Sequence, residues 1–137
     1  TALDVTIQAQ ILELMQKIQS ELNMSVVMIT HDLGVVGQVC DRVVVMYAGR
    51  IVESAPVDEL FDNPKHPYTQ GLLRSVPKLG DTVKDRIEPI EGAPPNLTAM
   101  PPGCRFAPRC KQRIAQCDNE PDLKEVGADH ECSCWLY

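Results

Sequence analysis

The sequence has no apolar segment long enough to cross a membrane. Its apolar runs, such as residues 43–46, are far shorter than the roughly 20 residues that a spanning helix needs. No charged-then-apolar segment opens the chain, so the sequence predicts no secretion signal. Positive charge is also scarce, since 13 Lys and Arg residues stand against 19 Asp and Glu residues. This balance argues against nucleic-acid binding, including binding by a zinc module.

Cysteine, in contrast, is plentiful in one region. Five of the six cysteines follow residue 100. Because the sequence predicts no secretion signal, we expect metal or redox chemistry from these thiols rather than a disulfide framework. The same region has few apolar residues, and a metal centre would supply stabilisation that its own core cannot.

Helix and strand patterns alternate in the first part of the chain. Apolar residues recur every three or four positions over residues 7–22, behind a helix cap at Asp4, and predict a long amphipathic helix. The β-prone run at 26–29 has no polar alternation, which favours a strand of a parallel sheet covered on both faces. A short helix and a second apolar strand at 42–47 follow. This order predicts an α/β fold.

His31 lies at the end of the first predicted strand, between Thr30 and Asp32. Open α/β sheets bind their ligands at the carboxyl ends of the strands, so His31 is the first candidate for chemistry. The alternative is a histidine that only makes a hydrogen bond at a strand end. The residues themselves leave both possibilities open.

The middle of the chain predicts smaller elements. Residues 48–49 lie between two β-prone stretches and indicate a tight hairpin turn. A short helix is expected over 56–61, since a proline and then two carboxylates open it. Pro67 opens another helix, and we expect His66 to cap it or to be exposed rather than to bind a ligand. Residues 78–103 are punctuated by proline and glycine and predict an extended linker.

Three motifs together resemble the last third of an ABC-transporter ATPase domain, which is of the P-loop NTPase type. Residues 27–33 resemble the segment around the family's switch histidine, and residues 41–53 resemble the strands that follow it. The resemblance to the D-loop lies in Ala2, Leu3 and Asp4. The resemblance to this ATPase domain implies that the D-loop reaches across an ATPase dimer. It also implies that His31 contacts the γ-phosphate of ATP. An imidazole suits that role, because phosphoryl transfer needs donors to the charge on the γ-phosphate oxygens.

Other motifs of that family are absent from this sequence. It has no Gly-x-x-x-x-Gly-Lys-Ser/Thr phosphate loop, no LSGGQ signature and no Walker B carboxylates. We therefore interpret the chain as a fragment of a longer protein, and expect that by itself it neither binds ATP tightly nor hydrolyses it. Strands that lack their usual neighbours have exposed edges, so we also expect the chain to self-associate.

Two further segments resemble the ATP-binding subunits of oligopeptide and dipeptide importers. They are residues 66–77, with His-Pro-Tyr-Thr, Leu-Leu and a proline, and residues 91–95, Glu-Gly-Ala-Pro-Pro. The resemblance implies that residues 1–76 end an ATPase domain and that residues 77–137 are the family's C-terminal extension, which we expect to be small, irregular and cysteine-rich. It implies a peripheral subunit at the cytoplasmic face of the membrane that uses ATP and Mg²⁺ for uptake of di- and oligopeptides. Implied partners are transmembrane permease subunits, a second ATPase subunit and, indirectly, an extracytoplasmic solute-binding protein.

The cysteines allow three explanations. Disulfides are least favoured, because the expected compartment is reducing. Zinc sites usually have cysteine pairs about two to four residues apart, whereas longer gaps separate the first three of these cysteines. A [4Fe-4S] cluster also takes four thiolates and tolerates varied spacing. The importer resemblance favours this cluster over zinc and implies as its ligands Cys104, Cys110, Cys117 and Cys134, with Cys132 as the alternate to Cys134.

Two other functions stay open at this point. The chain could be a non-catalytic, metal-binding regulatory or scaffold module that reuses part of an ATPase. It could also come from an importer of nickel or another small solute, since related importers share these motifs. The first alternative predicts a longer protein without the phosphate loop, the signature and the Walker B motif.

Overall fold

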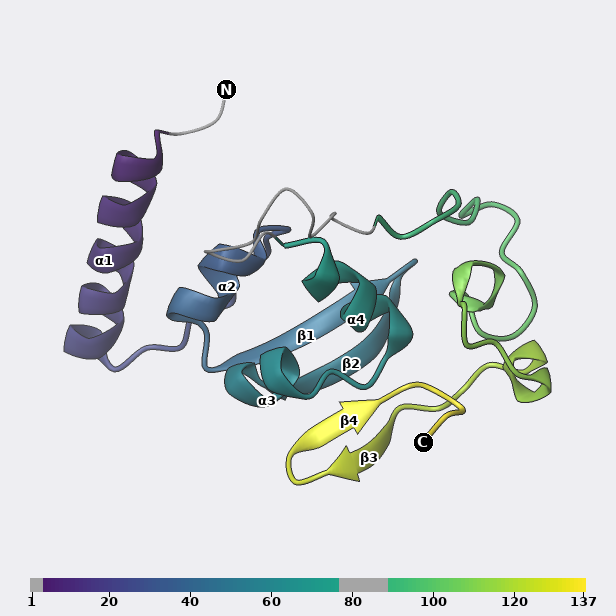
Figure 1. The fold of residues 1–137 in the computed structure, drawn as a ribbon. Coiled ribbons are helices and arrows are strands. Elements are labelled where there is room, and N and C mark those ends of the chain that lie inside the picture. Colours follow the sequence, from purple (N-terminus) through teal and green to yellow (C-terminus); the bar gives the residue numbers. More distant parts are fainter. Residues whose placement is uncertain (1–3, 77–88) are drawn as a thin grey trace. The chain divides into compact units, whose positions relative to one another are not determined.

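The computed structural model describes residues 4–76 and 89–137 and forms two compact units, Thr1–Val39 and Cys40–Tyr137 (Figure 1). Ala2 and Leu3 of the predicted D-loop lie outside the described residues. The predicted domain boundary after residue 76 adjoins a segment, 77–88, that is also outside them, and stays a prediction. Within the described ranges, no helix combines the length and the apolar character needed to cross a membrane.

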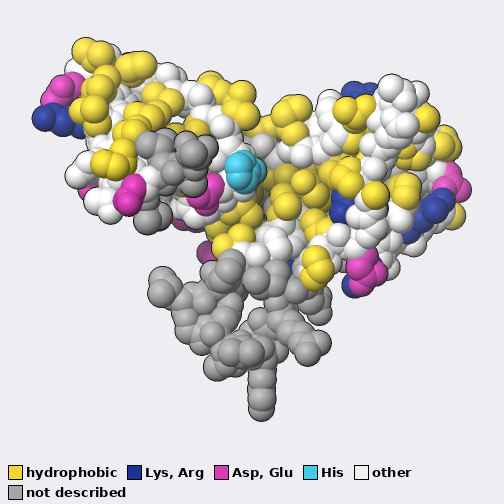
Figure 2. All heavy atoms as spheres, turned by 90° about the horizontal axis from the view of Figure 1, so that it is seen from above, with side chains coloured by type: hydrophobic (Ala, Val, Ile, Leu, Met, Phe, Trp, Pro, Cys, Tyr) yellow, Lys and Arg dark blue, Asp and Glu magenta, His cyan; other side chains and the backbone are white. Residues whose placement is uncertain are grey.

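Helix α1 (Val5–Leu22) confirms the predicted amphipathic helix. It begins at Asp4, whose side chain accepts the backbone N–H of Thr6 at 2.8 Å, and it ends at Asn23 in the left-handed conformation. Its apolar side chains are between 39% and 69% exposed at Ile7, Ile11, Leu14, Ile18 and Leu22. Figure 2 shows apolar side chains gathered over this helix, at the left of the view.

The predicted parallel strand at residues 26–29 is wrong. This segment has no regular structure, and the side chains of Val27 and Ile29 are 91% and 97% exposed. A strand needs a hydrogen-bonded neighbour, and the sheet found among the described residues is antiparallel and formed by later segments. The short helix expected after this segment is present as α2 (Leu33–Val39).

Strands β1 (Arg42–Tyr47) and β2 (Arg50–Pro56) form the predicted antiparallel hairpin. Ala48 and Gly49 make the turn with φ angles of 47° and 80°, which is the left-handed pair that tight hairpins favour. Alternate residues of β1 face the core, and the inward set is Val43, Val45 and Tyr47.

Helices α3 (Val57–Asp62) and α4 (Pro67–Arg74) cover one face of this hairpin (Figure 1). Both predicted helices are therefore confirmed. The most buried residues of α4 are Pro67, Thr69 and Gly71, whereas its larger apolar residues, Tyr68, Leu72 and Leu73, are only half-buried. Helix α4 packs through its small residues, which bring its backbone close to its neighbours.

The cysteine-rich segment continues the same sheet. It contains two short 3-10 helices, η1 (Ala107–Arg109) and η2 (Ala115–Asp118), and the strands β3 (Lys124–Gly127) and β4 (His130–Cys132). The strand order is β1-β2-β4-β3, and every pair is antiparallel. This segment is thus more regular than the irregular extension that we expected. Residues 89–103 hold no helix or strand, as predicted for a linker.

Aromatic rings join the cysteine-rich segment to the hairpin and α4. The ring of Phe106 lies 5.2 Å from that of Tyr47, 5.4 Å from that of Tyr68 and 5.7 Å from that of His66, centroid to centroid. Phe106 is almost completely buried. Burial of such rings is among the larger contributions to a small core, so residues beyond 100 share one core with residues 40–76.

Candidate functional site: a cysteine group anchored to the sheet

His31 lies in the bend before α2 and is exposed. Its neighbours are ordered, because Asp32 accepts the backbone N–H groups of Gly34 at 2.9 Å and Val35 at 3.3 Å and so caps α2. The side chain of Thr30 accepts the N–H of Asp32 at 3.0 Å. The histidine is therefore held at the entry to a helix, with its ring accessible. Its catalytic role stays a prediction.

Asp4 of the predicted D-loop serves as the cap of α1. The N–H of Thr6 that its carboxylate accepts lowers the pKa of Asp4 below its usual value. A charged cap suits the positive end of a helix.

The first three cysteines beyond residue 100, Cys104, Cys110 and Cys117, lie in two loops. A backbone hydrogen bond joins these loops. The N–H of Cys104 donates to the carbonyl of Cys117 at 3.0 Å. Gly103 comes so close to the second loop that a Cβ at this position would lie 2.5 Å from the carbonyl oxygens of Asp118 and Cys117. Gly103 also has a φ of 73°. Only glycine fits this crossing.

The thiols of the predicted ligand set influence one another's ionisation. Burial raises the pKa of Cys104, and the nearby thiols of Cys117 and Cys134 raise it further. Burial likewise raises the pKa of Cys110, with added contributions from Cys134, Cys117 and Cys104. All six cysteines of the chain are free. The structure thus brings the four predicted ligands near one another without any disulfide.

The thiols of Cys132 and Cys134 act on each other's ionisation. Their interaction lowers the pKa of Cys134 to about 7 and raises the pKa of Cys132. Cys132 is buried in β4, opposite Glu53 of β2, whereas Cys134 is only half-buried. Cys134 is therefore the more accessible and more readily ionised thiol of the pair.

The side chains as placed do not form a metal site. Among residues 4–76 and 89–137, no group of three or more His, Cys, Asp or Glu side chains is arranged to hold a metal ion. Cysteine thiolates are nevertheless the type of donor that a thiophilic metal prefers, and none of these cysteines is in a disulfide.

A buried carboxylate, which the sequence interpretation missed, anchors the cysteine strand. Glu53 is completely buried and accepts the backbone N–H groups of Lys65 at 2.6 Å and His66 at 3.0 Å. His130 of β4 is also completely buried, and its Nε2 lies 2.8 Å from the Glu53 carboxylate. Its Nδ1 lies 3.4 Å from Glu59. A glutamate within the β-prone stretch of β2 was the signal available in the sequence.

His66 was predicted either to cap α4 or to be exposed; it is buried, and the cap is confirmed. Its Nδ1 accepts the N–H of Tyr68 at 3.1 Å, at the start of α4. Burial lowers the pKa of His66 to about 4, against the opposite effect of the Glu53 charge. The ring therefore stays neutral at neutral pH and can act as an acceptor.

The basic residues of this segment each have a local partner. Arg105 donates to the carbonyl of Ala48, and Arg113 pairs with Asp118 at 2.7 Å. Lys111 pairs with Glu91 at 2.9 Å. These contacts hold neighbouring loops together, so the three basic side chains have a structural role. The other role open to them is to offset the negative charge of metal-bound thiolates.

Comparison with known proteins gives one consistent match. A family model described as oligopeptide/dipeptide transporter, C-terminal region, matches residues 52–117. A Brucella ovis protein with the provisional name peptide import ATP-binding protein is 54% identical over 140 residues, or 98% of this chain and 41% of that protein. The dipeptide transport ATP-binding protein of Bacillus subtilis is 53% identical over 137 residues, or 99% of this chain and 41% of that protein.

The oligopeptide transport ATP-binding protein of Bacillus subtilis is 50% identical over 138 residues, which cover 100% of this chain and 42% of that protein. The chain thus spans about two fifths of the length of these curated relatives. Over almost its whole length this chain is thus similar to ATP-binding proteins of oligopeptide and dipeptide transport, and its residues 52–117 match the family model of the transporter's C-terminal region.

Proposed function

We propose that this chain is the C-terminal part of the ATP-binding subunit of an ABC importer, which couples ATP hydrolysis to the uptake of di- and oligopeptides. The observation that carries this proposal is the 50–54% identity to peptide-transport ATP-binding proteins over almost every residue. Such a subunit works at the cytoplasmic face of the membrane, with permease subunits and a second ATPase subunit. It uses ATP and Mg²⁺.

His31 is proposed to sense the γ-phosphate of ATP. Its support is the ordered, accessible position before α2, where an imidazole nitrogen can donate a hydrogen bond to a phosphate oxygen. Residues 2–4 are proposed to be the D-loop at the dimer interface. Both roles belong to the longer protein, because these 137 residues contain no phosphate loop.

The test of this role uses the full-length protein that contains this sequence. We expect His31→Ala to leave nucleotide binding nearly unchanged and to abolish most hydrolysis, measured by fluorescent-nucleotide titration and phosphate release. Gln10→Ala, at an exposed position of α1, is the control and is expected to keep normal turnover. Normal hydrolysis by His31→Ala, or ATP turnover by the 137-residue chain alone, would contradict the proposal.

We further propose that Cys104, Cys110, Cys117 and Cys134 bind a [4Fe-4S] cluster, with zinc as the alternative metal. The mutual effect of these four thiols on their pKa values supports this set. Cys134 is favoured over Cys132 because its thiol is more exposed and ionises more readily. When bound, the cluster would supply the cross-link between the two loops and the chain end.

Metal analysis after purification without oxygen tests this assignment. We expect iron with matching acid-labile sulfide, and loss of both in Cys134→Ser. Cys40→Ser is the matched control, because Cys40 lies far along the sequence from the other five. Cys132→Ser is expected to retain the cluster. Zinc without sulfide would replace the iron assignment, and the absence of both metals would refute it.

A further inference from the structure

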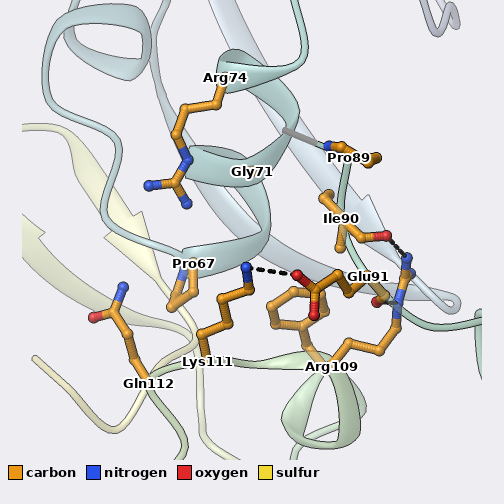
Figure 3. Close-up of a pocket in the computed structure, with 10 residues that line it drawn as sticks. Pro67, Gly71, Arg74, Pro89, Ile90, Glu91, Arg109, Lys111 and Gln112 are labelled. Atoms are coloured by element: carbon orange, nitrogen blue, oxygen red, sulfur yellow. Dashed lines mark hydrogen bonds and ion pairs between the residues drawn. The ribbon is translucent and has the colours of Figure 1, made fainter. Parts of the chain in front are cut away.

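A small pocket lies between α4, the linker and the cysteine loops. It has a volume of about 180 Å³ and is lined by Pro67, Gly71, Arg74, Pro89, Ile90, Glu91, Phe106, Arg109, Lys111 and Gln112. Its lining contains three cations and one carboxylate, and it therefore carries a net positive charge. Figure 3 shows the side chains of Arg74, Lys111 and Gln112 around one opening beside Pro67.

Two of the cations, Arg109 and Lys111, make contacts within the lining of the pocket. Arg109 donates to the carbonyls of Glu91 and Ile90, at 3.0 Å each, and to the hydroxyl of Tyr47 at 3.3 Å. Lys111 pairs with Glu91 at 2.9 Å, as the dashed line in Figure 3 marks. These contacts fix the linker at Ile90 and Glu91 against the cysteine loops, so the pocket has a defined shape.

Arg74 is different. It lies in the last turn of α4, and within residues 4–76 and 89–137 its guanidinium makes no hydrogen bond or ion pair. A guanidinium presents a planar pair of donors that matches a carboxylate. Arg74 is thus the group in this lining that has donors available to an incoming anion.

Apart from Gln112, the uncharged part of the lining is apolar. Gly71 allows Ile90 to pack against α4, since a Cβ at this position would lie 2.8 Å from the Ile90 side chain. Together with Pro67 and Phe106, Ile90 offers a surface for a short hydrocarbon group. The Glu91 carboxylate would repel a doubly charged phosphate more strongly than a singly charged carboxylate. The lining therefore favours an organic monoanion.

We propose that this pocket binds a small organic carboxylate that carries a short apolar group, such as the C-terminal residue of a peptide. The carboxylate lies on Arg74, with Lys111 and Gln112 beside it, and the apolar group lies on Ile90, Pro67 and Phe106. None of these contacts uses His31 or a cysteine thiol, although Arg109 and Lys111 flank Cys110. The presence or absence of this site can therefore be measured whether or not the proposed transport function holds.

The test is an NMR titration of the chain, labelled at backbone nitrogens and isoleucine methyl groups, at constant ionic strength. N-acetyl-L-valine is expected to shift the Gly71 amide and the Ile90 methyl signals with a saturable dependence on concentration. The uncharged analogue N-acetyl-L-valinamide and inorganic phosphate are expected to bind at least tenfold more weakly. No saturable shift, or equal binding of any of these probes, would overturn the proposal.

Variants of Arg74 test whether this residue binds the carboxylate. Arg74→Gln is expected to weaken binding of N-acetyl-L-valine about tenfold or more, because it removes a charge-assisted pair of hydrogen bonds. Arg74→Lys keeps the charge without the planar fork and is expected to weaken binding several-fold. Arg50→Gln removes an exposed guanidinium outside the pocket and should bind normally. Unchanged affinity in both Arg74 variants, with normal amide spectra, would exclude this site.

Discussion

At the scale of single residues, Glu53 connects more of the fold than any signal in its local sequence suggests. Its buried carboxylate accepts two backbone N–H groups at the start of α4 and contacts His130 of β4. Buried acceptors of this kind are costly to remove, because each partner that loses its hydrogen bond also stays away from water. The position of the cysteine strand therefore depends on a glutamate 77 positions earlier.

We expect Glu53→Ala to lower the free energy of unfolding by about 3–5 kcal/mol, since it leaves two N–H groups and an imidazole without their acceptor. Urea unfolding followed by circular dichroism measures the change. Glu125→Ala, at an exposed position of β3, is the control and should change it by less than about 0.5 kcal/mol. Equal losses in the two variants would contradict the role assigned to Glu53.

His66 makes stability depend on pH. Its pKa is about 4 in the folded chain, below the ordinary value of 6.5, so the unfolded chain binds the proton more readily between these pH values. The contribution of the neutral His66 ring to the free energy of unfolding is fully present above about pH 6.5. It is lost as the pH falls towards 4, by roughly 3 kcal/mol in total.

His66→Asn keeps a side-chain oxygen that can cap α4 but does not titrate. We expect its free energy of unfolding to fall less than that of the unmodified chain between about pH 7 and pH 4.5, by urea unfolding at both values. The same pH dependence in both proteins would show that His66 is not the group responsible.

At the scale of elements, glycines with positive φ set two different turns. Gly49 closes the β1–β2 hairpin with open space around it, because a Cβ there would meet only the Arg105 side chain, at 3.6 Å. Gly103 instead crosses the loop that carries Cys117, where a Cβ would clash with backbone oxygens. The two sites share a backbone conformation but differ in what surrounds them.

This difference gives a matched pair of substitutions. Gly49→Ala should cost about 1 kcal/mol of unfolding free energy for the left-handed conformation alone. Gly103→Ala should cost about 3 kcal/mol or more, because the clash adds to that strain. It should also speed the labelling of Cys104 and Cys117 by a thiol reagent, whereas Gly49→Ala should not. Similar costs and labelling rates in the two variants would refute the close crossing at Gly103.

Elements that depend on neighbouring residues were predictable from the sequence, and those that depend on distant ones were not. The helix behind Asp4, the turn at residues 48–49 and the cap at His66 all follow from local side chains. The run at 26–29 has the composition of a strand, but its pairing depends on segments that composition does not reveal. The Glu53–His130 contact and the sheet position of β4 were missed for the same reason.

The residue types of the candidate site could be predicted from the sequence, but their arrangement in space could not. The number and the positions of the cysteines are evident in the sequence, whereas the burial of Cys132 opposite Glu53 and the crossing at Gly103 follow only from the three-dimensional structure. His31 was located by motif resemblance, and its position before a capped helix follows from Asp32.

At the scale of the whole molecule, one side of α1 has apolar residues that are largely exposed. Apolar stripes of this kind on a helix favour association with another surface. We expect the chain to form dimers or larger species at micromolar concentration, measured by light scattering coupled to size-exclusion chromatography.

Leu14→Lys combined with Ile18→Lys should shift that equilibrium towards the monomer, because both changes place charge on the apolar side of α1. Ala9→Lys combined with Ser20→Lys adds the same charge on the polar side and should leave association unchanged. A monomer at all concentrations would contradict the prediction, as would an equal response of the two double variants.

The pairing of β2 with β4 has a consequence for how the chain is made. Synthesis runs from the N-terminal towards the C-terminal side, so the hairpin and α4 emerge well before His130 and Cys134 do. Until then, Glu53 has no imidazole partner, and the cysteine loops have no terminal strand to hold their last thiol. The thiols of the cysteine loops therefore gain that support only after residues 130–134 have been made.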